Sequence, residues 1–141
     1  QKQVGDFLGD WFGEVLKSSI REATFDYIIP VPLHPKKLRK RGYNQVEGFG
    51  KKLAGHLQAE YSNDFLFKTA NTRTQTRKSR LYRWTGSQAL YKLKQPGILN
   101  HKRVLLVDDV ITTGSTLEAC SKALKEVPNI KVSVAAMAVV R

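Results

Sequence analysis

The stretch that most constrains this chain is residues 104–116, which read Val-Leu-Leu-Val-Asp-Asp-Val-Ile-Thr-Thr-Gly-Ser-Thr. Its first four residues are valine or leucine, and such an apolar run is typical of a strand buried on both faces of a parallel sheet. Asp108 and Asp109 follow at the carboxyl end of this strand. A helix is predicted after the stretch, because apolar residues recur there at spacings of three and four: Leu117, Cys120, Ala123, Leu124 and Val127.

The order of strand, acids, hydroxyl-rich loop and helix has a chemical meaning. A helix N-terminus has unpaired N–H groups and a partial positive charge, so it suits a phosphate. Carboxylates a few residues earlier repel phosphate but accept hydrogen bonds from sugar hydroxyls. Because ligands of open α/β sheets sit beyond the carboxyl ends of the strands, the stretch predicts a site for a sugar phosphate. The alternative is an ordinary strand-to-helix turn with a Ser or Thr cap.

The rest of the chain predicts one α/β domain over residues 1–141, with an N-terminal helix in 1–25 and a core in 26–141. Apolar spacing predicts helices over residues 5–21 and 45–60, and strands over 27–31, 88–93 and 131–140. Pro30 has no N–H for a ladder, so the first strand is expected to end near it. No regular structure is predicted between residues 61 and 84. Strands that alternate with helices favour a parallel sheet.

Composition sets bounds on the class of protein. Apolar residues make up 41% of the chain, which is enough for a core. No run approaches the roughly 20 apolar residues that span a bilayer, and nothing resembles a signal peptide. The single cysteine excludes an internal disulfide, so a cytoplasmic location is expected. Cys120 itself is expected to be a small buried hydrophobe.

The basic charge is concentrated in the middle of the chain. The net charge is +12, and residues 34–103 hold 17 basic and 3 acidic residues, which is +14 for that segment. Such a concentration indicates a polyanionic ligand or partner. A diphosphate needs only a few of these cations, and nucleic acid is a candidate for the remainder. A solvated surface kept soluble by lysine is the alternative.

Four segments together resemble the type I phosphoribosyltransferases and, among them, the competence-associated ComF branch. They are residues 31–35 (Val-Pro-Leu-His-Pro), 41–45 (Arg-Gly-Tyr-Asn-Gln), 72–75 with Arg83, and 104–116. The resemblance implies a type I phosphoribosyltransferase-like (Rossmann-like) fold, with a parallel sheet flanked by helices. Two positions depart from the family pattern, Thr85 in place of Asn and Leu90 in place of Phe. Family members usually carry a cysteine-rich zinc ribbon before this region, and this chain shows none, so no metal site is assigned.

The resemblance also implies a site for phosphoribosyl pyrophosphate (PRPP). Asp108 and Asp109 would bind the ribose 2′- and 3′-hydroxyls, and Arg41 would offer its fork of donors to phosphate oxygens. The 5′-phosphate would be enclosed by Val110, Ile111, Thr112, Thr113, Gly114, Ser115 and Thr116. The leaving diphosphate, with Mg²⁺, would lie against the loop that contains Pro32, Leu33, His34, Lys36 and Lys37.

Two functions follow as hypotheses. The first is PRPP-dependent phosphoribosyl transfer, in which a nitrogen nucleophile attacks ribose C1 and pyrophosphate leaves; the acceptor is not legible in the sequence. The alternative is a non-catalytic accessory of DNA uptake that binds single-stranded DNA or competence proteins and keeps the PRPP site as a nucleotide sensor. Trp84 is a candidate for base stacking. A homodimer is a further option. A phospho-receiver domain is disfavoured by the Thr/Gly/Ser loop directly after the acids.

Overall fold

The computed structural model describes residues 2–19, 24–33, 46–69 and 90–140. The elements in chain order are α1 (Lys2–Ser19), β1 (Tyr27–Pro30), α3 (Val46–Leu57), β2 (Glu60–Tyr61), β3 (Leu66–Lys68), β4 (Tyr91–Leu93), the 3₁₀ turn η1 (Pro96–Leu99), β5 (Arg103–Ile111), α5 (Ser115–Lys125) and β6 (Lys131–Val139).

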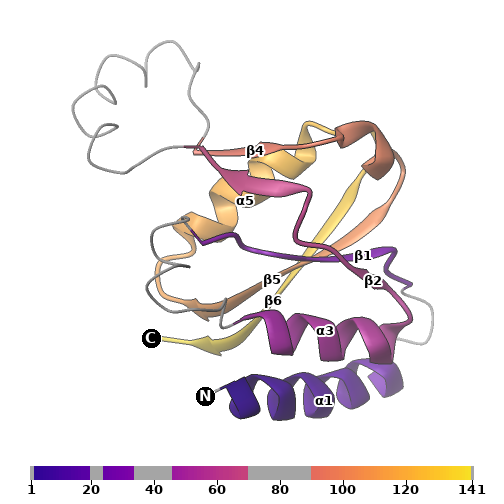
Figure 1. Cartoon of the computed structure of the whole chain (residues 1–141), viewed down its shortest axis with the longest axis vertical. Helices are drawn as coiled ribbons and strands as arrows, with labels where there is room; N and C mark the ends of the chain where they lie inside the picture. The colour runs from indigo at the N-terminus through magenta and orange to yellow at the C-terminus, as the bar shows by residue number, and fades with distance from the viewer. Residues whose placement is uncertain (1, 20–23, 34–45, 70–89, 141) are drawn as a thin grey trace.

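The centre of the fold is a four-stranded parallel sheet in the order β2-β1-β5-β6. Helix α5 and the antiparallel β3–β4 pair lie on one side of this sheet, and α3 lies on the other with α1 outside it (Figure 1). A parallel sheet flanked by helices was the predicted fold class, and the structure confirms it.

Strand β5 explains why an unbroken apolar run is needed at the centre. Val104 and Leu106 pack in the cluster that includes α5, whereas Leu105 and Val107 pack in the cluster that includes α3. Alternate residues of a strand point to opposite faces, so a strand covered on both faces needs apolar side chains at every position. All four side chains are at most 3% exposed.

Pro30 ends β1, an interior strand of the sheet, although a proline has no N–H to donate to a ladder. The β1–β2 ladder pairs only Tyr27 and Ile28 of β1, so β2 has ended before Pro30 is reached. The Ile28 carbonyl accepts a bond from the Ser62 N–H on the β2 side, and by alternation Pro30 turns its ring nitrogen to that same side. The missing N–H therefore costs no ladder bond.

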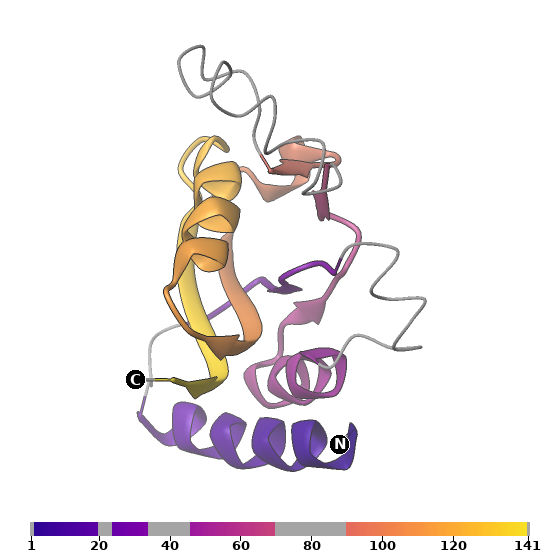
Figure 2. The same cartoon turned by 90° about the vertical axis from the view of Figure 1, so that its left-hand side faces the viewer.

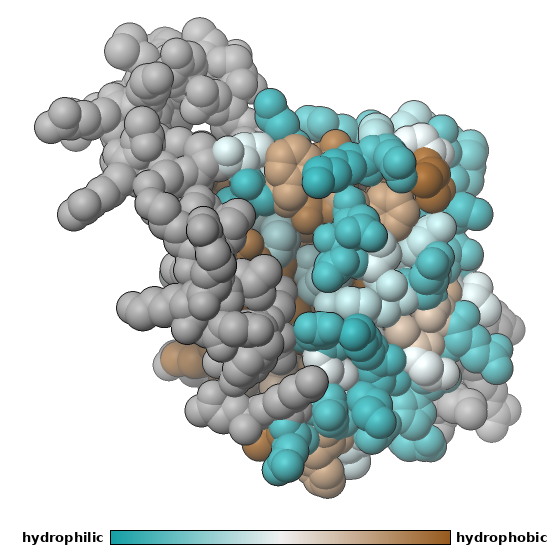
Figure 3. Space-filling model, in the orientation of Figure 1, coloured by the Kyte–Doolittle hydropathy of each residue, from teal (hydrophilic) through white to brown (hydrophobic). Residues whose placement is uncertain are grey.

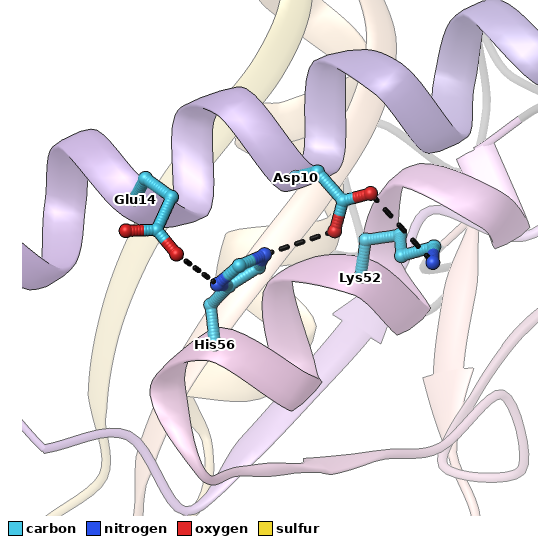
Figure 4. A network of polar contacts seen from close by, with 4 residues as sticks. All are labelled: Asp10, Glu14, Lys52 and His56. Carbon is cyan, nitrogen blue, oxygen red and sulfur yellow. Dashed lines mark hydrogen bonds and ion pairs between the residues drawn. The ribbon is translucent and has the colours of Figure 1, made fainter.

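Helix α1 packs on the outer face of α3 through glycines. A Cβ added at Gly9 would stand 2.7 Å from the Phe49 carbonyl oxygen, and one at Gly13 would stand 2.6 Å from the His56 ring. The His56 Nε2 lies 2.9 Å from Asp10 Oδ1, and its Nδ1 lies 3.2 Å from Glu14 Oε1 (Figure 4). Close backbone approach and this polar contact together fix α1 on α3.

Several predicted boundaries differ from the structure. Helix α1 begins at Lys2, before the predicted residue 5. Helix α3 ends at Leu57 because Gln58 has a positive φ of 54° and the chain turns into β2. Strand β3 lies where no regular structure was predicted, and β2 begins at Glu60, which was predicted to be the last residue of the helix. Strand β5 continues to Ile111, so the acids lie inside the strand and do not follow it.

Candidate sugar-phosphate site at the carboxyl edge of the sheet

The loop between β5 and α5 forms a small hollow at the helix N-terminus. Gly114 adopts a φ of 82°, which a residue with a side chain rarely tolerates, and its carbonyl accepts the first helical bond from the Glu118 N–H at 2.9 Å. The hollow has a volume of about 20 Å³, and it is lined by Asp108, Val110, Ile111, Thr112, Thr113, Gly114, Ser115, Thr116 and Leu117. The predicted phosphate-loop residues are thus brought together around one space.

One hydroxyl of the loop serves the turn itself. The Thr113 Oγ1 accepts a bond from the Ser115 N–H at 3.3 Å and lies 3.0 Å from the Ser115 Oγ. A Thr that supports the turn is also expected from the alternative interpretation of this motif, an ordinary strand-to-helix turn with a Ser or Thr cap. The exposed side chains of Thr112 and Thr116 supply two further hydroxyl groups beside the hollow.

The two acids hold the backbone at the end of β5. Asp108 Oδ1 accepts a bond from the Asp109 N–H at 2.8 Å, and Asp109 Oδ1 accepts one from the Val110 N–H at 2.7 Å. Within the described residues neither carboxylate belongs to an ion pair. Burial raises the pKa of Asp108 to about 6, and the neighbouring Asp109 adds to that rise. Asp108 is thus a half-buried acid of weakened acidity with spare acceptor capacity.

Asp108 faces the layer that contains β3, β4 and α5. Its charge contributes to the raised pKa of Tyr91, about 12, although burial is the larger cause. The same holds for Cys120, whose pKa is also raised to about 12 by burial and then by Asp108, while Lys68 acts in the opposite direction. Cys120 is a buried free thiol, which matches its predicted role as a small core residue.

Sequence reasoning missed Tyr91 as a neighbour of Asp108, and Lys68 as a neighbour of Cys120. They are register partners in the antiparallel β3–β4 pair, whose strands lie outside the contiguous stretch that contains Asp108 and the phosphate loop. A strand as short as β3 carries too few residues for its period to be read, so no local signal marks Lys68.

The loop after β1 reaches the same edge of the sheet as the acids. The Val31 N–H donates to the Val107 carbonyl at 2.8 Å, so Pro32 and Leu33 leave the sheet on the strand next to Asp108. Both side chains are half-buried. The other predicted diphosphate ligands, His34, Lys36, Lys37 and Arg41, lie outside the described residues, as do Thr72, Gln75, Arg83 and Trp84.

A larger groove, of about 540 Å³, lies away from this edge. It runs between β4, η1 and the carboxyl end of α5, with Tyr91, Pro96, Ala123 and Val127 among its lining residues. The acids and the phosphate loop are at the opposite end of α5, so this groove is not the sugar-phosphate site. Size alone does not identify the site here, because a phosphate is held by backbone donors and not by apolar walls.

Comparison with known proteins identifies the class of protein that this fold and site define. Residues 48–140 match the phosphoribosyl transferase domain, and the chain belongs to that family. Among solved structures, the glutamine PRPP amidotransferase from B. subtilis superposes with a TM-score of 0.68 at 20% identity, over 96% of this chain and 26% of that one. An adenine phosphoribosyltransferase superposes with a TM-score of 0.58 at 18% identity, over 94% of this chain and 68% of that one. These likenesses concern the fold.

Two of the curated relatives are competence proteins by name. Competence protein F of Haemophilus influenzae is 37% identical over 100 residues, which are 70% of this chain and 44% of that protein. Competence protein ComFC of Streptococcus pneumoniae is 32% identical over 123 residues, or 86% of this chain and 52% of that protein. The chain thus spans about half the length of these relatives. They confirm the resemblance to the competence-associated branch.

Proposed function

We propose that the carboxyl edge of the sheet binds PRPP and that the protein transfers or holds its 5-phosphoribosyl group, with pyrophosphate as the leaving group. Asp108 and Asp109 accept hydrogen bonds from the ribose hydroxyls. The loop 112–116 and the N-terminus of α5 hold the 5′-phosphate. The diphosphate is assigned to Pro32 and Leu33 and to the cations that follow them in the sequence, Lys36, Lys37 and Arg41.

The observation that carries this proposal is the hollow that Asp108 shares with the phosphate loop. Asp108 lines the same space as residues 112–116. A single strand-to-helix connection therefore offers an acceptor for the ribose hydroxyls and donors for the 5′-phosphate of one ligand. Among the described side chains neither acid belongs to an ion pair, so the carboxylates keep acceptor capacity for a ligand beyond the backbone N–H groups bound by their Oδ1 atoms. Phosphoribosyl transfer then needs a positioned ribose and a neutralised diphosphate rather than a protein nucleophile.

The residues present also fit a magnesium ion that travels with the diphosphate. Mg²⁺ takes oxygen ligands, keeps several waters and is commonly held by one or two carboxylates and substrate phosphates. Asp108 and Asp109 are such donors. No group of three His, Cys, Asp or Glu side chains comes together in the described parts of the chain, so a dedicated all-protein metal cage is not part of the proposal.

Calorimetry with PRPP and Mg²⁺ tests the assignment. The double variant Asp108→Asn, Asp109→Asn should bind at least about tenfold more weakly, since a hydrogen bond to a charged acceptor contributes about 1.5–3 kcal/mol. The control is Asp64→Asn, Glu126→Gln, which removes the same charge far from the hollow. Equal affinity in the unmodified chain and the Asp108/Asp109 variant would reject the proposed roles.

Ribose 5-phosphate separates the two halves of the site. It retains the hydroxyls and the 5′-phosphate but lacks the diphosphate, so it should compete with PRPP and show the same dependence on Asp108 and Asp109. In the absence of Mg²⁺, inorganic pyrophosphate should compete without that dependence, because only the metal would connect the diphosphate to the two acids. Release of pyrophosphate in the presence of candidate amine acceptors then distinguishes a transferase from a protein that only binds.

The basic middle segment and the competence relatives favour a second candidate function. Residues 34–103 carry a net charge of +14, and Lys51, Lys52, Lys92 and Lys94 are exposed. We propose single-stranded DNA, or another competence protein, as the partner of this charge. Binding of an oligonucleotide should weaken steeply as salt rises. The Asp108→Asn, Asp109→Asn variant should bind it no less tightly, and a chain that binds no oligonucleotide at low salt would exclude the DNA candidate.

A further inference from the structure

Strand β4 is the edge of a two-stranded sheet. Among the described strands it pairs with β3 alone. Backbone bonds at the two ends of the pair fix which residues of β4 face β3. The Lys94 N–H donates to the Phe65 carbonyl at 2.7 Å, and the Thr69 N–H donates to the Leu90 carbonyl at 2.9 Å. The two bonds agree with one unbroken register, so the alternation is the same along the whole strand.

The remaining backbone groups of β4 point outward. Lys92 lies two residues from each of those bonded positions and faces β3 as they do. Tyr91 and Leu93 alternate with it, so both direct their N–H and C=O groups away from β3. In the described parts of the chain no backbone hydrogen bond reaches these four groups. An edge of this kind is a template for a further strand.

The larger groove, of about 540 Å³, follows this edge. Its lining includes Tyr91, Lys92 and Leu93, and the side chains of consecutive strand residues alternate between the two faces, so a groove lined by all three runs along the edge. The other wall is the carboxyl end of α5, and Figure 2 shows the β3–β4 pair beside that end of the helix. Backbone donors and acceptors on one wall and a helix on the other fit an extended peptide.

The face of β4 that carries Tyr91 and Leu93 sets the apolar positions of such a peptide. Tyr91 is 5% exposed and belongs to the hydrophobic cluster that contains α5, and Leu93 packs against the same cluster. Peptide residues opposite these two direct their side chains to this face, toward Ala123 and Val127 on the other wall. Glu126 lines that wall as well and would repel an acid there. Both positions are therefore expected to be apolar.

The other face of β4 carries positive charge. Lys92 and Lys94 alternate with the more buried residues, and both are exposed. In an antiparallel addition the middle residue of the peptide stands opposite Lys92, where an opposite charge is favourable. Leu90 and Ile98, which flank β4 in the chain, are 41% and 46% exposed, and Figure 3 shows apolar side chains among hydrophilic ones at this upper end of the molecule. The edge thus fits the order apolar, acidic, apolar.

We propose that the β4 edge binds an extended peptide of a partner protein, which adds to the β3–β4 sheet as an antiparallel third strand. The occupant is a peptide because the outward groups of Tyr91 and Leu93 have strand spacing and can form about four backbone hydrogen bonds. Its sequence places an acidic residue opposite Lys92 and an apolar residue on each side of it. The groove lies at the end of α5 away from the sugar-phosphate site, so this inference does not depend on what that site binds.

Fluorescence anisotropy of the full chain with a labelled peptide, Thr-Val-Glu-Val-Thr, tests the proposal. Protein is titrated to about 1 mM, because four backbone bonds give a modest affinity. Methylation of both valine nitrogens removes the two N–H groups that would donate to β4. Methylation of the glutamate nitrogen is the matched control, since that N–H would point away from β4. A second peptide, Thr-Val-Lys-Val-Thr, reverses the charge of the middle residue.

The parent peptide should bind, methylation of the valines should weaken binding at least about tenfold, and methylation of the glutamate should leave it unchanged. Lys92→Glu should weaken the parent peptide by about three- to tenfold and bind the lysine peptide more tightly than the unmodified chain does. Lys51→Glu makes the same charge change on α3, across the central sheet, and should have no effect. No binding up to the highest concentration overturns the proposal. So does equal binding of the valine-methylated peptide, or a Lys92→Glu variant with unchanged preference.

Discussion

At the scale of single residues, Asp108 has the most unusual environment. Its half-buried position at the end of β5, beside Asp109, raises its pKa from 3.8 to about 6. The folded chain therefore holds a proton on Asp108 at a pH where the unfolded chain has lost it. Where the folded state binds more protons, the free energy of unfolding decreases as the pH rises. Burial of this acid lowers stability at neutral pH, which is common where a group serves binding.

The first prediction concerns Asp108→Asn. This variant should be more stable than the unmodified chain above pH 6, and the difference should shrink as the pH falls from about 6 to 4. The full pKa shift corresponds to about 3 kcal/mol, and partial exposure of the carboxylate reduces the expected gain to about 1–2 kcal/mol. Urea unfolding of both proteins at several pH values measures it. A constant difference across that range would contradict the assigned pKa.

At the scale of elements, the contact between α1 and α3 depends on glycine. Helix α1 places Gly5, Gly9 and Gly13 on one face, all buried, which allows the two backbones to approach closely. Glycine inside a helix costs about 0.5–1 kcal/mol relative to alanine. The packing has to compensate for that cost three times in this one helix.

Gly9→Ala and Gly55→Ala form a matched pair. An added Cβ at Gly9 meets the Phe49 carbonyl oxygen at 2.7 Å, whereas one at Gly55 has no atom within 4 Å. Gly55→Ala should therefore raise the free energy of unfolding by about 0.5–1 kcal/mol. Gly9→Ala should lower it by about 1–3 kcal/mol, because backbone atoms cannot move aside as a flexible side chain does. Thermal and urea unfolding decide the sign at each position, and a stabilising Gly9→Ala would show that the helices are not in close contact.

The elements also show what the sequence was able to predict. Long, strongly patterned segments made four elements predictable: strands β5 and β6 and helices α3 and α5. Helix α5 ends at Lys125, before the break that was expected at Pro128. Strands β2 and β3 have two and three residues, and they exist because their partners β1 and β4 are in place. The acids and the phosphate loop were predictable because they are contiguous. The positions of Tyr91 and Lys68 were not, because tertiary structure brings Tyr91 near Asp108 and Lys68 near Cys120.

At the scale of the whole molecule, the layers differ in how firmly they are held. Strands β1 and β5 lie between two hydrophobic clusters, with Ile28, Ile29, Val104 and Leu106 fully buried. Helix α1 is the outermost layer and rests on α3, while Val4, Phe7 and Trp11 on its other side are exposed. None of the described helices has the length and apolar character needed to cross a membrane. Local opening should therefore start at α1 and reach the sheet last.

Hydrogen exchange with and without the polar contact of α1 tests this order. His56→Ala removes the contacts of His56 with Asp10 and Glu14 and the ring that packs against Gly13, and leaves only Lys52 paired with Asp10. The α1 amides should therefore exchange at least about tenfold faster. Amides of β5 should keep their rates, because neither cluster around the sheet contains His56. Lys51→Ala is the control, since Lys51 also lies on α3 but pairs with Glu47 of the same helix. Equal acceleration of α1 and β5 in His56→Ala would mean that the molecule opens as one unit. The sugar-phosphate edge would then share the stability of its outermost helix.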